Sequence, residues 1–267
     1  MTKPTDGVIV AAPSLSEVIS RNVTLAAVLE PIADKPGCTT RYVDLKPSKA
    51  LEYFLTGGVN IGPAFAHLVK HVNSRNTGRG VYKYFVEAIA YSKANRAGGK
   101  INQGIIEPLI PIVTAQVMFD PKAEKTPKYV LNKTKTVMKT SSKYDVHRLI
   151  EGKQFANALS NFNRQPVLKH NVDSVYEYYA ADLVASRDLK SAGFNEEYVD
   201  SFPRIYQSYQ NIKRSQKVKI SDKLADAYLD LFRTYPKAAL GVGSAADYVA
   251  CGLFLYLSYA GDKTIVV

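Results

Sequence analysis

The feature that most constrains this chain is a helical spacing of apolar residues that runs through almost all of it. Between residues 61 and 72, for example, Ile61, Phe65, Leu68 and Val72 recur at intervals of three and four. Apolar residues at this spacing form one stripe along an α-helix. Alternation typical of strands is confined to two short stretches, 7–11 and 264–267. The sequence therefore predicts an all-α fold.

One stretch differs from the amphipathic helices around it. Residues 105–117 are apolar on all sides, which is typical of a helix buried in the centre of a protein. Pro108 and Pro111 within this stretch predict a kink or a break. Further upstream, we expect Gly57 and Gly58 to interrupt a short helix that begins near Pro47.

The chain shows no internal repeat and no linker rich in Pro, Gly or Ser. Its 267 residues can bury a sizeable core. The simplest organisation is a single helical domain over residues 1–267. No apolar stretch approaches the roughly 18 residues that a membrane span requires, and the N-terminus lacks a secretory apolar segment. We therefore predict a cytoplasmic protein with no membrane partner.

The net charge of +11 is the main compositional signal about partners. Seven lysines lie between residues 121 and 143 against a single Glu124, and the turn-forming residues there predict a loop or an extended connection. Three interpretations stay open: nucleic-acid binding, an anionic small-molecule substrate, or solubility alone. No known nucleic-acid-binding motif accompanies the charge.

The first candidate site lies at the polar break after the first predicted helix. It contains Glu30, Lys35, Gly37, Arg41 and Asp44. A Pro-Gly turn forces a change of direction and aims the preceding lysine and the following amides at one place. The ordinary interpretation is a helix connection. The functional one makes Lys35 and Arg41 phosphate ligands, with Glu30 and Asp44 binding Mg²⁺ or stabilising a developing positive charge.

A second polar break precedes the central apolar helix. It contains Gly99, Lys100, Asn102, Gln103 and Gly104. Free amides at a helix start favour phosphate, so this break is a candidate anion site. It does not match the P-loop pattern.

A third segment carries Arg187 next to Asp188, near the end of a predicted helix. Taken in order, the three segments resemble the triphosphoribosyl-dephospho-CoA synthase (CitG-like) family, particularly its archaeal-type branch. That family has a helix ending in glutamate, a Lys-Pro-Gly turn, an Asn-containing turn entering a very apolar helix, and a later Arg-Asp pair. The resemblance spans roughly residues 20–260. Its matching positions are Glu30, Lys35, Gly37, Asp44, Asn102, Gly104, Arg187 and Asp188.

The resemblance implies an all-α transferase that joins the ribose of ATP to the ribose of dephospho-CoA, releasing adenine and keeping the triphosphate. Such a reaction builds positive charge at the sugar C1′, so it needs carboxylates near C1′ and cations on the phosphates.

The resemblance also implies a role for each matching residue. Lys35 and Arg41 would bind phosphate, and Arg187 would contact phosphate or orient Asp188. The carboxylates of Glu30, Asp44 and Asp188 would share a magnesium ion and stabilise charge. The segment from Gly98 to Gly104, with Gly99, Lys100, Asn102 and Gln103, would hold the nucleotide.

One departure leaves the substrate pair open. The bacterial enzymes have His-Lys where this chain has Asn102 and Gln103, so a base and a cation are missing at that turn. Expected partners are nucleotides or ribose-phosphate molecules, and we allow for a homodimer.

Two alternatives to this function remain. The first is a related transferase that attaches a phosphoribosyl unit in the biosynthesis of a pterin or another one-carbon cofactor. The second is a non-catalytic basic helical protein that binds nucleic acid or polyphosphate. Carboxylates at the same breaks as the cations speak against the second alternative, because an anion binder has no use for them there.

Overall fold

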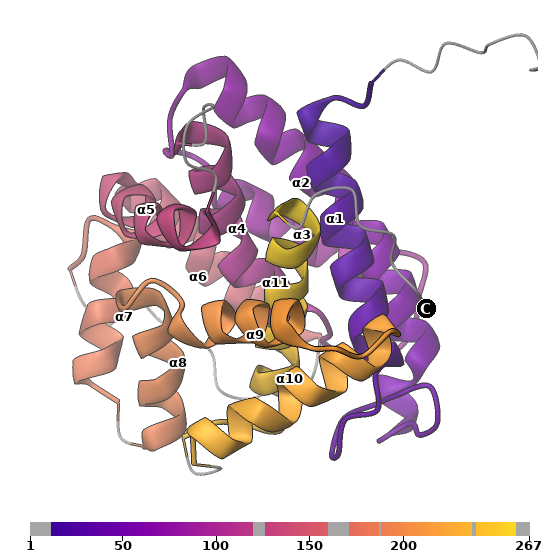
Figure 1. The fold of residues 1–267 in the computed structure, drawn as a ribbon. Coiled ribbons are helices and arrows are strands. Elements are labelled where there is room, and N and C mark those ends of the chain that lie inside the picture. Colours follow the sequence, from indigo (N-terminus) through magenta and orange to yellow (C-terminus); the bar gives the residue numbers. More distant parts are fainter. Residues whose placement is uncertain (1–11, 120–125, 160–170, 187, 237–238, 260–267) are drawn as a thin grey trace, which may run out of the picture.

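Helices follow one another through the computed structural model, which describes residues 12–119, 126–159, 171–186, 188–236 and 239–259 (Figure 1). The described residues form α1 (Leu15–Leu29), α2 (Leu51–Arg75), α3 (Lys83–Lys93), α4 (Gln103–Phe119), α5 (Pro127–Thr140), α6 (Lys143–Ala158), α7 (Val175–Val184), α8 (Leu189–Val199), α9 (Pro203–Arg214), α10 (Ile220–Thr234) and α11 (Val242–Tyr259), with 3-10 turns η1 (Glu30–Ile32) and η2 (Pro47–Lys49). None of these residues lies in a β-strand, so the predicted all-α fold is confirmed. The two stretches with strand-like alternation, 7–11 and 264–267, lie outside the described residues.

Helix α4 is the centre of the fold. Every residue from Ile105 to Gln116 is buried, and the helix packs against α2, α3, α5 and α11. The prediction of a buried central helix is confirmed. Of the predicted kink or break, the break does not occur, because α4 continues through Pro108 and Pro111. Each proline removes one backbone donor from a helix, and packing on all sides compensates for that local loss.

The glycines at 57 and 58 do not interrupt a helix, so this prediction is also wrong. They lie within α2, where they permit close packing. A β-carbon on Gly58 would lie 3.1 Å from Val28 Cγ2 in α1, and one on Gly57 would lie 2.8 Å from Ile101 Cδ1. The absence of a side chain lets α1 and the turn before α4 approach α2 directly.

The lysine-rich segment is a helix over most of its length, which corrects the prediction of a loop. Thr126 caps α5 by accepting a hydrogen bond from the Tyr129 amide at 3.3 Å, and Pro127 occupies the first turn. Proline is well suited to that position. Val130, Val137 and Met138 are buried on one face. The turn-forming residues at 126–127 mark the start of a helix, whereas residues 120–125 lie outside the described ranges.

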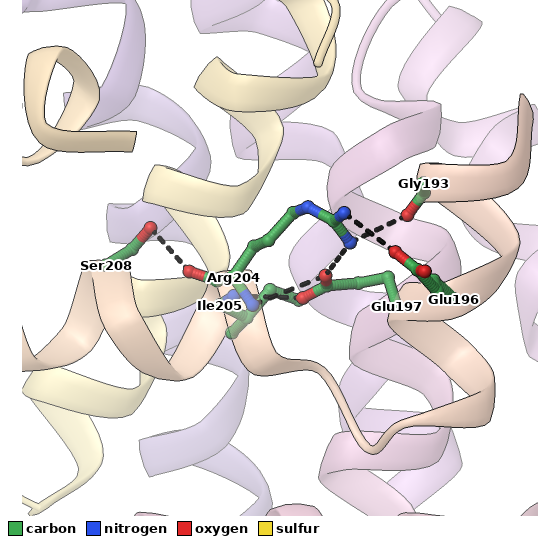
Figure 2. A network of polar contacts seen from close by, with 6 residues as sticks. All are labelled: Gly193, Glu196, Glu197, Arg204, Ile205 and Ser208. Carbon is green, nitrogen blue, oxygen red and sulfur yellow. Dashed lines mark hydrogen bonds and ion pairs between the residues drawn. The ribbon is translucent and has the colours of Figure 1, made fainter. Parts of the chain in front are cut away.

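A buried ion pair joins α8 to α9 (Figure 2). Arg204 Nη1 lies 3.1 Å from Glu197 Oε2 and donates to the Gly193 carbonyl at 2.8 Å, while Nη2 lies 3.0 Å from Glu196 Oε2. Glu197 also accepts from the Ile205 amide at 2.9 Å. Burial raises the pKa of Glu197 to about 7, although the hydrogen bond from Ile205 and the charge of Arg204 oppose that rise.

None of the helices in the described ranges has the length and apolar character needed to cross a lipid bilayer.

We expect Arg204→Met to lower the free energy of unfolding by about 3–5 kcal/mol, because it leaves the carboxylate of Glu197 buried without its partner. Equilibrium urea unfolding measures this change. Glu196→Gln is the matched control: Glu196 is half exposed, and surface pairs contribute only about 0–1 kcal/mol. Equal losses in the two variants would contradict the assignment of the buried pair as the contact that joins α8 to α9.

Candidate functional site

The first turns of α4 and α11 meet the connection between α1 and α2 at a cavity of about 220 Å³. Several residues predicted from the sequence line it together. They are Glu30, Gly37, Lys100, Asn102, Gln103 and Gly104. The cavity therefore brings the first and second polar breaks of the sequence to one place.

A second hollow of about 360 Å³ lies beside the first and is bordered by residues of α6, α7 and α8. Lys100, Gln103, Gly104 and Asp247 line both hollows. The two spaces therefore share a wall, which is formed by the turn that enters α4 and one side chain of α11. A site with two adjoining spaces is suited to bringing two substrates together.

Asp247 packs directly onto the backbone of Gly104. A β-carbon on Gly104 would lie only 2.0 Å from Asp247 Oδ2, so any other residue would have to displace the carboxyl group. Glycine at this position allows α11 to place an acidic group over the first turn of α4, where unpaired backbone N–H groups concentrate.

The environment of Asp247 favours its neutral form. Burial raises the pKa of Asp247 to about 8, and the negative charge of Glu30 adds to the rise, while Lys100 and Lys49 oppose it. The half-buried Asp247 side chain therefore favours its protonated form, a carboxylic acid that can donate a proton. A pair of carboxyl groups in different protonation states is a common arrangement for acid–base chemistry.

Glu30 is held in the cavity wall by Lys35. The Lys35 side chain has no exposed surface, and its Nζ lies 3.0 Å from Glu30 Oε1. The same ammonium group donates to the carbonyls of Glu30 and Ala33. A lysine has three N–H donors, and all three have acceptors inside the protein. Lys35 thus holds the Glu30 carboxyl group in place next to the cavity.

Asn102 provides the clearest sign of a missing ligand. Its side chain is buried, it adopts a left-handed φ of 59°, and it lines the first cavity. Neither its Oδ1 nor its Nδ2 has a hydrogen-bond partner within the described part of the chain. Buried polar groups are nearly always paired. A bound molecule with both a donor and an acceptor would complete this amide.

The other predicted residues lie elsewhere. Arg41 is exposed, with its guanidinium group 4.9 Å from the centre of the Tyr42 ring. Asp44 accepts a hydrogen bond from the Leu51 amide at 2.8 Å at the start of α2. Asp188 caps α8 by accepting from the Ser191 amide at 2.9 Å.

The remaining two predicted residues are Gly99 and Arg187. The N–H of Gly99 donates to the Ser48 carbonyl at 3.2 Å, so it is engaged in holding the turn before α4. Arg187 lies outside the described residues.

No group of three or more His, Cys, Asp or Glu side chains in the described ranges is arranged to hold a metal ion. Glu30, Asp44 and Asp188 are thus not gathered into one such group. The cavity does contain two carboxyl groups, Glu30 and Asp247. Magnesium is often bound by one or two carboxylates together with substrate phosphates and water, so Glu30 fits a metal that arrives with a phosphate, whereas the neutral form of Asp247 would not bind one.

Sequence reasoning missed Asp247 and Lys49, which both line the first cavity. A signal for Asp247 exists in the sequence. Gly241, Gly243 and Ser244 precede it at the start of an apolar helix, just as Gly98 and Gly99 precede the central helix. Glycines and a polar residue therefore lie at or just before the start of both apolar helices, α4 and α11.

Comparison with known proteins identifies one family. The family model CitG, described as ATP:dephospho-CoA triphosphoribosyl transferase, matches residues 16–240. No curated protein and no solved structure matches the chain.

The raised pKa of Asp247 predicts a pH-dependent stability. The folded protein retains a proton on Asp247 that the unfolded chain releases above about pH 4. The contribution of Asp247 to the free energy of unfolding is therefore complete below that pH and is lost as the pH rises towards about 8. We expect urea unfolding to show the wild type losing stability relative to Asp247→Asn between about pH 5 and about pH 8, since asparagine cannot ionise. A stability difference that stays constant over this range would contradict the assignment.

Proposed function

Because this chain belongs to the ATP:dephospho-CoA triphosphoribosyl transferase family, we propose that its two adjoining hollows hold the ribonucleotide donor and the ribonucleotide acceptor of a triphosphoribosyl transfer. In this reaction the bond from C1′ to the adenine nitrogen breaks and a bond from C1′ to an acceptor hydroxyl oxygen forms. The hydroxyl proton leaves, overall, with adenine. One observation carries the proposal: the hollows share a wall that bears Asp247 and the first turn of α4.

The first cavity suits the nucleotide donor. Lys49 and Lys100 line it, and the start of α4 presents backbone N–H groups that favour an anion. Burial lowers the pKa of Lys100, so a bound triphosphate would favour its charged form. We assign the phosphates to these groups rather than to Lys35, whose ammonium group is bound within the protein. Asn102 would hold a polar edge of the same nucleotide.

The two carboxyl groups have complementary tasks in this proposal. Asp247, in its protonated form, donates its proton to the departing adenine. Glu30, held in place by Lys35, stabilises positive charge at C1′ and accepts the proton of the attacking hydroxyl. This division follows the general rule that a general acid needs a pKa near the working pH.

A magnesium ion bound by the substrate phosphates fits the cavity. Glu30 is the carboxyl group that would hold it there, because Asp247 carries a proton in this proposal. When bound, such an ion would neutralise part of the charge on the triphosphate.

We expect Asp247→Asn to lower kcat by about 10²–10⁴-fold, because the variant has no proton to give to the leaving base. The measurement is the release of adenine from ATP in the presence of dephospho-CoA and Mg²⁺, detected by chromatography. Mass spectrometry identifies the joined product. ATP affinity should change little. Asp230→Asn, which alters a surface pair with Arg233 on α10, is the control and should keep full turnover. Normal turnover in Asp247→Asn would overturn the assigned acid.

The assignments of Asp44 and Asp188, which rest on the resemblance, are tested with the same assay. A large fall in kcat in Asp44→Ala or Asp188→Ala would support a catalytic task for that residue. Full turnover with a loss of about 1 kcal/mol in unfolding free energy would leave each as a helix cap only.

A further inference from the structure

A chain of three polar groups, in which Glu107 is buried and Gln103 and Lys153 are half-buried, runs from the shared wall of the two hollows into the core. Gln103 Nε2 donates to Glu107 Oε2 at 2.9 Å, and Lys153 Nζ lies 2.9 Å from Glu107 Oε1. The Tyr179 hydroxyl also donates to Glu107. All three groups of the chain border the second hollow, and Gln103 borders the first as well.

The middle member of this chain is an ionised carboxylate. Glu107 has no exposed surface, and Lys153 crosses from α6 to reach it. Burial opposes ionisation, but the charge of Lys153 and the hydrogen bonds from Tyr179, Lys153 and Gln103 prevail and lower the pKa of Glu107. The rings of Tyr178, Tyr179 and Phe194 lie about the Lys153 ammonium group, with centroids 4.9–5.4 Å away.

An ionised carboxylate only accepts hydrogen bonds, and this fixes the amide of Gln103. The NH₂ group of Gln103 must face Glu107, so its carbonyl oxygen must face away. That oxygen, Oε1, is buried and has no hydrogen-bond partner among the residues the structure describes. A buried acceptor without a donor is costly. The site is therefore short of one donor at a position that both hollows share.

We propose that Gln103 is a specificity-determining residue whose Oε1 accepts a hydrogen bond from a ribose hydroxyl of a bound nucleotide, and that Glu107 and Lys153 are positioning residues that fix the Gln103 amide in that orientation. The inference rests on the proposed function in taking the two hollows as the substrate sites. It extends that function by naming the ribose hydroxyl as the group that is recognised and the Glu107–Lys153 pair as the contact that orients the Gln103 amide.

The chemistry of the missing partner selects a hydroxyl group. A phosphate offers acceptors and would repel Oε1, whereas a sugar hydroxyl can donate. Gln103 lies on the shared wall, and the proposed transfer joins one ribose to another, so the sugars meet there.

The test measures binding by titration calorimetry, which needs no turnover. The ligands are ATP, 2′-deoxy-ATP, 3′-deoxy-ATP and inosine triphosphate, together with dephospho-CoA and its analogues lacking one ribose hydroxyl. We expect the wild-type protein to bind one deoxy analogue about 10-fold more weakly than its parent, as a lost hydrogen bond predicts. Whether this analogue derives from ATP or from dephospho-CoA identifies the nucleotide that Gln103 contacts.

Gln103→Leu should bind the parent ligand about 10-fold more weakly and should no longer distinguish it from that deoxy analogue. Glu107→Gln should reduce in part the ratio of the affinities for the parent and deoxy ligands. A neutral amide at position 107 can donate a hydrogen bond as well as accept one, so the Gln103 amide is free to rotate by about 180°. Lys153→Arg, which keeps the charge, should preserve the ratio. A residue that only maintains the fold would change both affinities and leave their ratio intact.

A Gln103→Leu protein that keeps the wild-type ratio of affinities for the parent and deoxy ligands would overturn the proposal. So would a Gln103→Leu protein that no longer distinguishes ATP from inosine triphosphate but still distinguishes the parent from the deoxy analogue. Inosine triphosphate lacks the adenine amino group, so that result would mean that Gln103 contacts the base. If the wild-type protein bound neither ATP nor dephospho-CoA, the proposed function would fail first and this inference with it. That outcome appears before any variant is made, so the two failures are distinguishable.

Discussion

The site depends on the contact between Asp247 and Gly104. It requires a glycine in the first turn of the central helix α4 and an acidic residue in the second turn of α11, the last described helix. Since α4 is fixed by packing on all sides, it provides a rigid floor, and α11 brings the carboxyl group to it. The wall between the two hollows follows from this one close approach.

Two lysines, Lys35 buried and Lys153 half-buried, perform the same physical task on opposite sides of this wall. Lys35 holds the carboxylate of Glu30 beside the first cavity, and Lys153 holds that of Glu107 beside the second. In each case the cation is withdrawn from solvent and satisfied within the protein, so its main effect is to keep a neighbouring carboxyl group in place. Placing charges in the core is costly, and such pairs are justified where they confer orientation.

Much of the fold could be predicted from the sequence, because helical periodicity depends on local spacing. The central helix, for example, was evident from its apolar residues. The errors concern residues whose local meaning depends on tertiary contacts. Gly57 and Gly58 suggested a break, but close packing against Val28 and Ile101 explains them. Pro127 suggested a loop, but it begins α5.

The site could be predicted only in part. The turn at 99–104 was identified because glycines and polar residues precede an apolar helix, and the family resemblance drew attention to Glu30. Asp247 could not be paired with Gly104 from spacing, because the contact joins residues far apart in the chain. The burial of Lys35 could not be foreseen either, since a lysine in a turn is usually exposed.

Helix α11 also sets the order in which the site can come into existence. It is the last helix to leave the ribosome among those described, yet it packs against α1, α4, α9 and α10. A nascent chain that ends before it has Glu30 and the start of α4 but no wall between the hollows. Such a chain also leaves uncovered the apolar faces that α11 later occupies. The two hollows are therefore complete only in chains whose synthesis has passed this helix, and shorter chains expose apolar surface that chaperones or proteases recognise.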